Sequence, residues 1–130
     1  MENRASGDTV TLDGAEKARR SVLIVDDDEE IRHVLRLMCE MEGFEVIGEA
    51  SNGVEAVSLA LHHQPGFVIL DYLMPRLKGD EAAKMLRAIA PEAKIVAFSA
   101  VLESKPKWSD SYLNKDRVGE IAPLLERLIV

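Results

Sequence analysis

The stretch that decides the fold is Ser21-Val-Leu-Ile-Val-Asp-Asp-Asp28, an apolar, β-branched run that ends in three consecutive acids. A short run of this composition is typical of a strand buried on both faces, as in a parallel sheet. Two further runs have the same character: Phe67-Val-Ile-Leu70, which leads into Asp71, and 94–99, which ends at Ser99. The sequence therefore predicts three buried strands, each leading into a polar side chain.

Apolar stripes with helical spacing separate the predicted strands. They comprise Ile31, Val34, Leu35 and Met38; Val54, Val57 and Leu61; Ala82, Met85, Leu86 and Ile89; and Ile121, Leu124, Leu125 and Leu128. Strand-like residues also occupy 44–50 and 112–113. Strands that alternate with helices predict an α/β fold, a parallel sheet with helices on both faces. Because Pro123 falls inside the last stripe, that helix is expected to start late, near Gly119, or to be kinked.

Polar residues follow the predicted strands where each strand ends. Asp26 and Asp27 follow the first strand and Asp71 follows the third. Ser99 closes the fourth, and Lys115 follows the short fifth. Since binding sites in parallel sheets form at the carboxyl ends of the strands, we expect these side chains to converge.

This set of side chains predicts magnesium-dependent phosphoryl chemistry. Neighbouring carboxylates repel one another, and Mg²⁺, which prefers oxygen ligands and works with phosphates, relieves that repulsion. An Asp beside Mg²⁺ can attack phosphorus, while Lys115 and Ser99 can offer a charge and a hydroxyl to the phosphoryl oxygens. We therefore expect Asp71 to form an aspartyl phosphate.

The same residues have simpler interpretations as helix caps, a turn residue or a solvated charge. We prefer such an interpretation for Asp28 and Glu29, which precede the first apolar stripe. It does not explain why Asp26 and Asp27 lie directly at the end of a buried strand. Nor does it explain why four strand ends each carry a polar residue, so the sequence favours a site.

At these residues the chain resembles the receiver domain of bacterial two-component response regulators, including the chemotaxis regulators, over about residues 21–130. Val25-Asp-Asp-Asp-Glu-Glu-Ile-Arg32 is similar to the acidic-pair motif of that family. Asp71-Tyr-Leu-Met-Pro75, with Gly79, is similar to the phosphorylation-site motif. Phe98-Ser-Ala100 and Tyr112-Leu-Asn-Lys115 match the hydroxyl, aromatic and lysine positions. Each motif alone is weak, but their combination is specific.

The resemblance implies a flavodoxin-like, doubly wound, five-stranded parallel sheet with strand order 2-1-3-4-5, the order for which a chemotaxis receiver is itself a common illustration. It implies that Mg²⁺ is held by the side chains of Asp26, Asp27 and Asp71 and by the backbone carbonyl of Leu73. The phosphoryl donor would be a sensor histidine kinase or a phosphotransfer protein. The chain would catalyse only its own phosphorylation and dephosphorylation.

Ser99 and Tyr112 match the family's switch positions, through which phosphorylation would control an unidentified downstream protein. Between them the chain departs from the pattern, because 101–110 is short, contains Pro106 and lacks apolar periodicity. We expect a shortened or irregular fourth helix region there. Our hypothesis is that this segment is mobile and that its basic and aromatic residues, Lys105, Lys107 and Trp108, contact the partner.

Four other functions fit the sequence less well. A phosphatase of the haloacid dehalogenase type usually has a second acid two positions after the nucleophile, where this chain has Leu73. The complete set of polar residues speaks against a receiver-like module that is never phosphorylated. A dinucleotide-binding domain would need a glycine-rich fingerprint after the first strand. A histidine phosphotransfer protein would be entirely helical.

Bulk properties narrow the setting. The length of 130 residues predicts one domain, over 21–130, after a flexible N-terminal tail over 1–20. A net charge of −7 offers no basic field, so we expect no direct nucleic-acid binding. We expect no membrane segment or signal peptide, since no apolar run is long enough. The single cysteine, Cys39, cannot form an intrachain disulfide. A standalone signalling switch in a reducing cytoplasm is therefore expected.

Overall fold

The computed structural model describes residues 13–74 and 76–129. Five strands form one sheet in the order β2-β1-β3-β4-β5, and every neighbouring pair is parallel. The strands are β1 (Ser21–Val25), β2 (Glu45–Ala50), β3 (Phe67–Leu70), β4 (Lys94–Ser99) and β5 (Ser111–Asn114). This arrangement confirms the predicted flavodoxin-like fold and its strand order.

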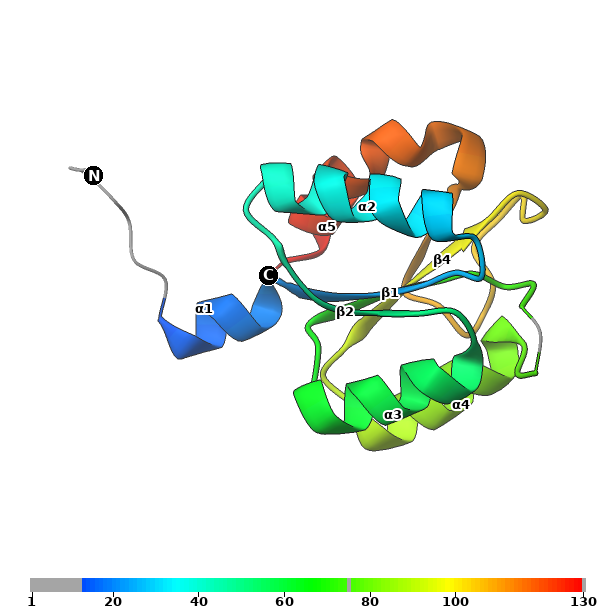
Figure 1. Ribbon diagram of the computed structural model, residues 1–130, viewed down its shortest axis with the longest axis horizontal. Helices are drawn as coiled ribbons and strands as arrows, with labels where there is room; N and C mark the ends of the chain where they lie inside the picture. Colours follow the sequence, from blue (N-terminus) through cyan, green and yellow to red (C-terminus); the bar gives the residue numbers. More distant parts are fainter. Residues whose placement is uncertain (1–12, 75, 130) are drawn as a thin grey trace.

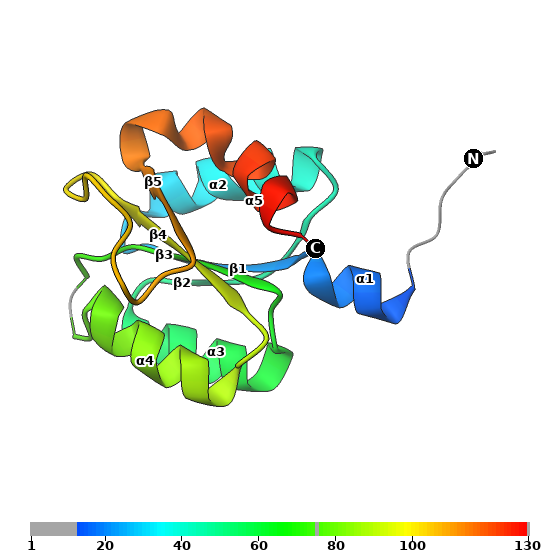
Figure 2. The same ribbon diagram turned by 180° about the vertical axis from the view of Figure 1, so that it is seen from behind.

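Two pairs of helices cover the two faces of the sheet, α2 and α5 on one face and α3 and α4 on the other (Figures 1 and 2). Their bounds are α2 (Glu29–Met41), α3 (Gly53–His63), α4 (Gly79–Ile89) and α5 (Ile121–Leu128). Every residue of β1 and β3 is buried, as a sheet covered on both faces requires. The strands can therefore hold the residues at their ends in fixed positions.

The two faces have different cores. Under α2 and α5 the core holds large side chains, among them Phe44, Phe67, Phe98, Ile121 and Leu125. Under α3 and α4 it is rich in alanine, with Ala56, Ala60, Ala82, Ala83 and Ala90. Small side chains let α3 and α4 pack closely against the sheet and against each other.

A short helix precedes the sheet. The prediction of a flexible tail over 1–20 is wrong for α1 (Gly14–Arg19), which Asp13 caps by accepting a hydrogen bond from the backbone of Glu16 at 2.8 Å. A Cβ at Gly66 would lie 2.4 Å from the carbonyl oxygen of Ala18, so only glycine lets α1 rest there. The remainder of the predicted tail, 1–12, lies outside the described residues.

The chain ahead of the last helix forms a 3₁₀ turn, η1 (Lys115–Glu120). Helix α5 then begins at Ile121. Pro123 therefore lies in the first turn, where its missing N–H removes no bond within the helix. The prediction of a late start is confirmed.

The connection between β4 and β5 contains no helix at any of its residues, 100–110, all of which are described. The predicted irregular fourth helix region is thus confirmed. None of the described helices is long and apolar enough to cross a lipid bilayer.

Candidate functional site

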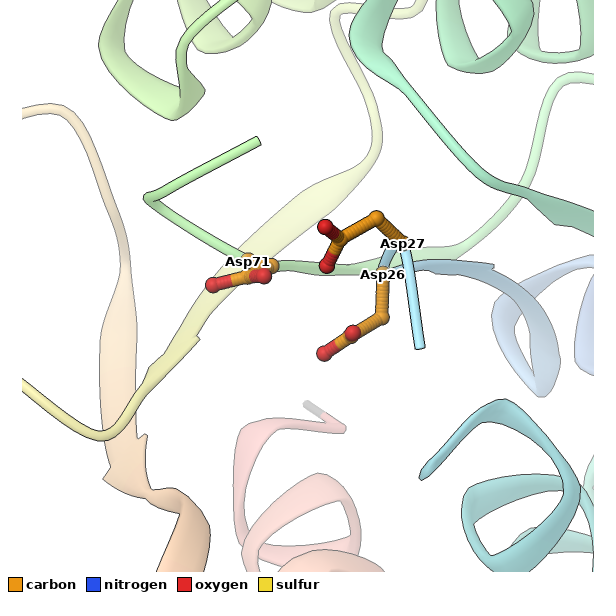
Figure 3. A group of neighbouring side chains, drawn as sticks. All are labelled: Asp26, Asp27 and Asp71. Atoms are coloured by element: carbon orange, nitrogen blue, oxygen red, sulfur yellow. The ribbon is translucent and has the colours of Figure 1, made fainter. Parts of the chain in front are cut away.

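Three carboxylates meet at the carboxyl ends of β1 and β3. Figure 3 shows the side chains of Asp26, Asp27 and Asp71 close together at this edge, and one oxygen of each lies within 4.8 Å of the others. The sheet places them, because Val25 pairs with Leu70 in register and the next residue of each strand is an acid. The backbone N–H of Asp71 continues the ladder by donating to the carbonyl of Val25 at 3.0 Å.

Asp26 is completely buried. One of its oxygens accepts a hydrogen bond from the backbone N–H of Asp28 at 2.9 Å. The other oxygen, Oδ2, is 2.8 Å from the Lys115 ammonium, but no described donor reaches it with hydrogen-bond geometry. A buried anionic oxygen needs a cation, and the lysine alone leaves it incompletely satisfied.

Asp28 has a separate role. Its side chain accepts hydrogen bonds from the backbone N–H groups of Glu30 and Ile31, at 2.9 and 3.4 Å. It therefore caps α2, and the simpler interpretation of this acid is confirmed. Asp27, which lies between Asp26 and Asp28 in the sequence, is exposed, and its side chain turns toward those of Asp26 and Asp71.

Lys115, directly after β5, connects the two buried acids. Its Nζ lies 2.8 Å from Asp26 Oδ2 and 3.3 Å from Asp71 Oδ2. Burial lowers the pKa of this ammonium, but contacts with both carboxylates outweigh burial and raise it above its usual value. Lys115 therefore stays positively charged beside the acids.

Asp71 is buried, and its ionisation is disfavoured. Burial, followed by the charge of Asp26, raises the pKa of Asp71 to about 6 even though Lys115 opposes the shift. One lysine thus does not balance the three carboxylates. The missing positive charge and the oxygen-only donor set both fit a hard divalent cation such as Mg²⁺.

Ser99 is buried at the end of β4, at the same edge of the sheet. Its Oγ accepts a hydrogen bond from the backbone N–H of Val101 at 3.3 Å. Within the described residues, no hydrogen bond joins Ser99 to Asp71 or Lys115. Tyr112 is half-buried in β5, and its hydroxyl donates to the carbonyl of Glu103 at 2.9 Å. Ser99 thus shares the edge of the acids, while the Tyr112 hydroxyl points to the irregular connection.

The loop after Asp71 is folded back onto the start of α4. The N–H of Leu73 donates to Asp71 Oδ1 at 3.3 Å, and the N–H of Gly79 donates to the carbonyl of Tyr72 at 3.0 Å. A Cβ at Gly79 would lie 2.8 Å from Tyr72 Cα, so glycine is required here. Pro75 lies outside the described residues. A role for the Leu73 carbonyl as a metal ligand stays a prediction.

Two aromatic side chains join this loop to the irregular connection, and the sequence did not reveal their contact. The rings of Tyr72 and Trp108 stack with centroids 6.0 Å apart and planes inclined by 20°. The only signal in the sequence was an aromatic residue directly after the predicted acceptor. No periodic pattern connects it to Trp108.

Comparison with known proteins gives a consistent result. The family model described as "Response regulator receiver domain" matches residues 22–109. The transcriptional regulatory protein PdtaR of Mycobacterium tuberculosis is 38% identical over 93% of this chain. This chain spans only 61% of the length of PdtaR. The chemotaxis protein CheY of Thermotoga maritima is 42% identical over 63% of this chain and 68% of its own length.

Solved structures agree with the sequence matches. The response regulator TrrA of Thermotoga maritima, solved in complex with Mg²⁺ and BeF, superposes with a TM-score of 0.75 at 30% identity. The match covers 84% of this chain and 98% of that one. The response regulator domain of Thermotoga maritima CheB gives a TM-score of 0.73 at 27% identity, over 83% and 92% of the two chains.

Proposed function

Since the chain belongs to the family of response regulator receiver domains, a family of two-component signalling, we propose that Asp71 accepts the phosphoryl group. In this proposal the side chains of Asp26, Asp27 and Asp71 and the backbone carbonyl of Leu73 would hold Mg²⁺. The observation that carries the proposal is the buried Asp71 carboxylate, with two acids and one lysine around it and too little positive charge.

The residues around Asp71 suit in-line attack on phosphorus. A carboxylate oxygen of Asp71 forms the new P–O bond while the bond to the donor's leaving group breaks. When bound, Mg²⁺ would supply positive charge to the acids and to the phosphoryl oxygens. The Nζ of Lys115 lies 3.3 Å from Asp71 Oδ2. After the transfer it can form an ion pair with a phosphoryl oxygen.

Ser99 offers a second donor. Its oxygen accepts from the backbone of Val101, so its own hydrogen remains available for a phosphoryl oxygen. Movement of Ser99 toward the phosphate would open space behind it and favour an inward turn of Tyr112. The phosphoryl group would thus bias a two-state equilibrium of the surface formed by β5, α5 and the irregular connection.

The proposed donor is a sensor histidine kinase or a phosphotransfer protein, and the proposed output is a contact with a protein partner. The only catalysis we propose is that of the domain's own phosphorylation and dephosphorylation. The net charge of −7 argues against direct nucleic-acid binding by this domain. A cytoplasmic location remains a prediction.

The direct test is incubation with acetyl phosphate followed by intact-mass measurement. Wild-type protein should gain one acid-labile phosphoryl group with Mg²⁺ and none with a chelator. Asp71→Ala should gain none. Asp80→Ala is the matched control, because it removes an exposed Asp in the first turn of α4, and it should label like wild type. Full labelling of Asp71→Ala would overturn the assignment.

A further inference from the structure

The irregular connection between β4 and β5 is anchored in two places. Its first half is tied to the edge strand, because the Tyr112 hydroxyl donates to the carbonyl of Glu103. Its second half, residues 106–110, packs against the face of the sheet that α3 and α4 cover. There Trp108 contacts the alanine-rich core and the ring of Tyr72. The second anchor reaches the residue directly after Asp71.

A small set of hydrogen bonds positions the 106–110 segment, which carries Trp108. Arg87 of α4 donates to the carbonyl of Trp108 at 3.0 Å and to the carboxylate of Asp110 at 3.0 Å. Asp110 also exchanges two hydrogen bonds with the backbone of Ile95, both at 2.8 Å. Ser109 is buried and donates from both its N–H and its hydroxyl to the carbonyl of Pro106. The indole ring therefore stacks on Tyr72 from a backbone that these few hydrogen bonds position.

Tyr72 is held on its other side by the site itself. Its backbone lies between Asp71 and Leu73, whose N–H donates to the Asp71 carboxylate. Its carbonyl accepts the N–H of Gly79 at the start of α4. A change in the position of the Asp71 carboxylate or of the loop therefore reaches the ring of Tyr72 through one residue of backbone.

We propose that Tyr72 and Trp108 act as a positioning pair, through which the acidic site and the 106–110 segment stabilise each other's bound-state geometry. The inference rests on the proposed function, since it takes Asp71 as the acceptor. The stack holds the loop that carries Asp71 and Leu73 in place for Mg²⁺ and the phosphoryl group. By reciprocity, ligands at the site change the order of the 106–110 segment.

This route differs from the one through Ser99 and Tyr112, which runs along β4 and β5. It uses α4 and the alanine-rich face of the sheet instead. Stacked aromatic pairs contribute enough for removal of one ring to weaken binding at the site by roughly two- to tenfold. Both rings are half-buried, so their replacement leaves the main core intact.

The test compares Tyr72→Leu with its matched control Tyr72→Phe, which keeps the ring. Trp108 is the single tryptophan of the chain and reports the stack by its fluorescence. On addition of Mg²⁺ and beryllofluoride, wild type and Tyr72→Phe should show the same change in emission and new hydrogen-exchange protection over 106–110. Tyr72→Leu should lose most of both changes and bind Mg²⁺ roughly two- to tenfold more weakly.

A double-mutant cycle sharpens the test. Trp108→Leu, followed by titration calorimetry, should weaken Mg²⁺ binding as much as Tyr72→Leu, and the double variant should bind no more weakly than either single variant. If Tyr72→Leu kept the wild-type Mg²⁺ affinity and hydrogen-exchange protection, the positioning pair would be overturned and the proposed function would stand. Wild-type protein that neither binds Mg²⁺ nor gains a phosphoryl group would instead overturn the proposed function.

Discussion

The acidic site and the 106–110 segment lie on either side of the Tyr72–Trp108 stack, but they are built in opposite ways. Asp26 and Asp71 are buried at the ends of neighbouring strands, where the sheet forces like charges together. The 106–110 segment belongs to no helix or strand. It is positioned by hydrogen bonds from Arg87 and by those between Asp110 and Ile95. In the site, a bound cation would relieve the repulsion between neighbouring carboxylates. The segment depends instead on a few contacts that a ligand at the site can reinforce.

The largest expected effect concerns the cost in stability of the buried Asp71 carboxylate. Burial and Asp26 raise the pKa of Asp71 from 3.8 to about 6. The folded protein therefore holds a proton that the unfolded chain releases, and it loses stability as the pH rises from about 4 to about 6. Asp71→Asn should remove that loss and stabilise the metal-free protein at pH 8 by about 3 kcal/mol.

Denaturant unfolding in the presence of a chelator, at pH 8 and near pH 3.5, measures this effect. The gain from Asp71→Asn should nearly vanish at the lower pH, where Asp71 is protonated in the folded protein and mostly protonated in the unfolded chain. Asp80→Asn, which changes an exposed Asp, should show little gain at either pH. An equal gain from Asp71→Asn at both pH values would mean that ionisation of Asp71 does not cause the loss of stability.

The second prediction concerns the ligand that relieves the charge. Replacing both Asp26 and Asp27 by Asn removes two anionic donors from the site. Mg²⁺ affinity, measured by titration calorimetry, should fall by about a hundredfold or more, since changes outside the ligand shell alone cost up to about that much. Asp28→Asn should have little effect, because Asp28 caps α2. Unchanged affinity in the double variant would remove Asp26 and Asp27 from the metal site.

The third prediction tests the other region. Asp110→Ala removes the acceptor shared by Arg87 and the backbone N–H of Ile95. Loss of such charge-assisted hydrogen bonds should destabilise the 106–110 segment by about 2 kcal/mol. Hydrogen exchange over 106–110 should accelerate while β1 and β3 remain protected. Uniform acceleration over the whole chain would show that the segment does not open independently of the sheet.

The smallest effect concerns the lifetime of the phosphoryl group. Leu73 and Val101 follow Asp71 and Ser99 by two positions, and their side chains are 51% and 55% exposed. Neither side chain can hydrogen-bond an attacking water, so dephosphorylation should be slow. Leu73→Asn should speed the loss of the phosphoryl group by roughly tenfold, less than a full general base provides. A wild-type aspartyl phosphate that decays within seconds would contradict this explanation.

The sequence predicted the acidic site better than the segment, for a physical reason. A buried strand leaves a continuous apolar run, and parallel strands bring their carboxyl ends to one edge, so Asp26, Asp71 and Lys115 could be placed together from local patterns. The absence of a stripe over 101–110 also predicted the irregular connection correctly. Mobility of that connection and its contact with a partner remain predictions.

Contacts between distant residues were not predictable in this way. The Tyr72–Trp108 stack and the link from Arg87 to Asp110 join positions far apart in the sequence, and no periodicity connects them. Helix α1 was missed because it buries none of its six residues and therefore shows no apolar stripe. Its place depends instead on the space left by Gly66.

Mapping of the phosphoryl group in the wild-type chain tests the central claim most directly. Protein labelled with acetyl phosphate and Mg²⁺ can be reduced with borohydride, which converts an aspartyl phosphate to a stable homoserine, and then digested and sequenced by mass spectrometry. We predict a single modified position, Asp71. Modification at Asp26 or Asp27, with Asp71 unmodified, would contradict this assignment.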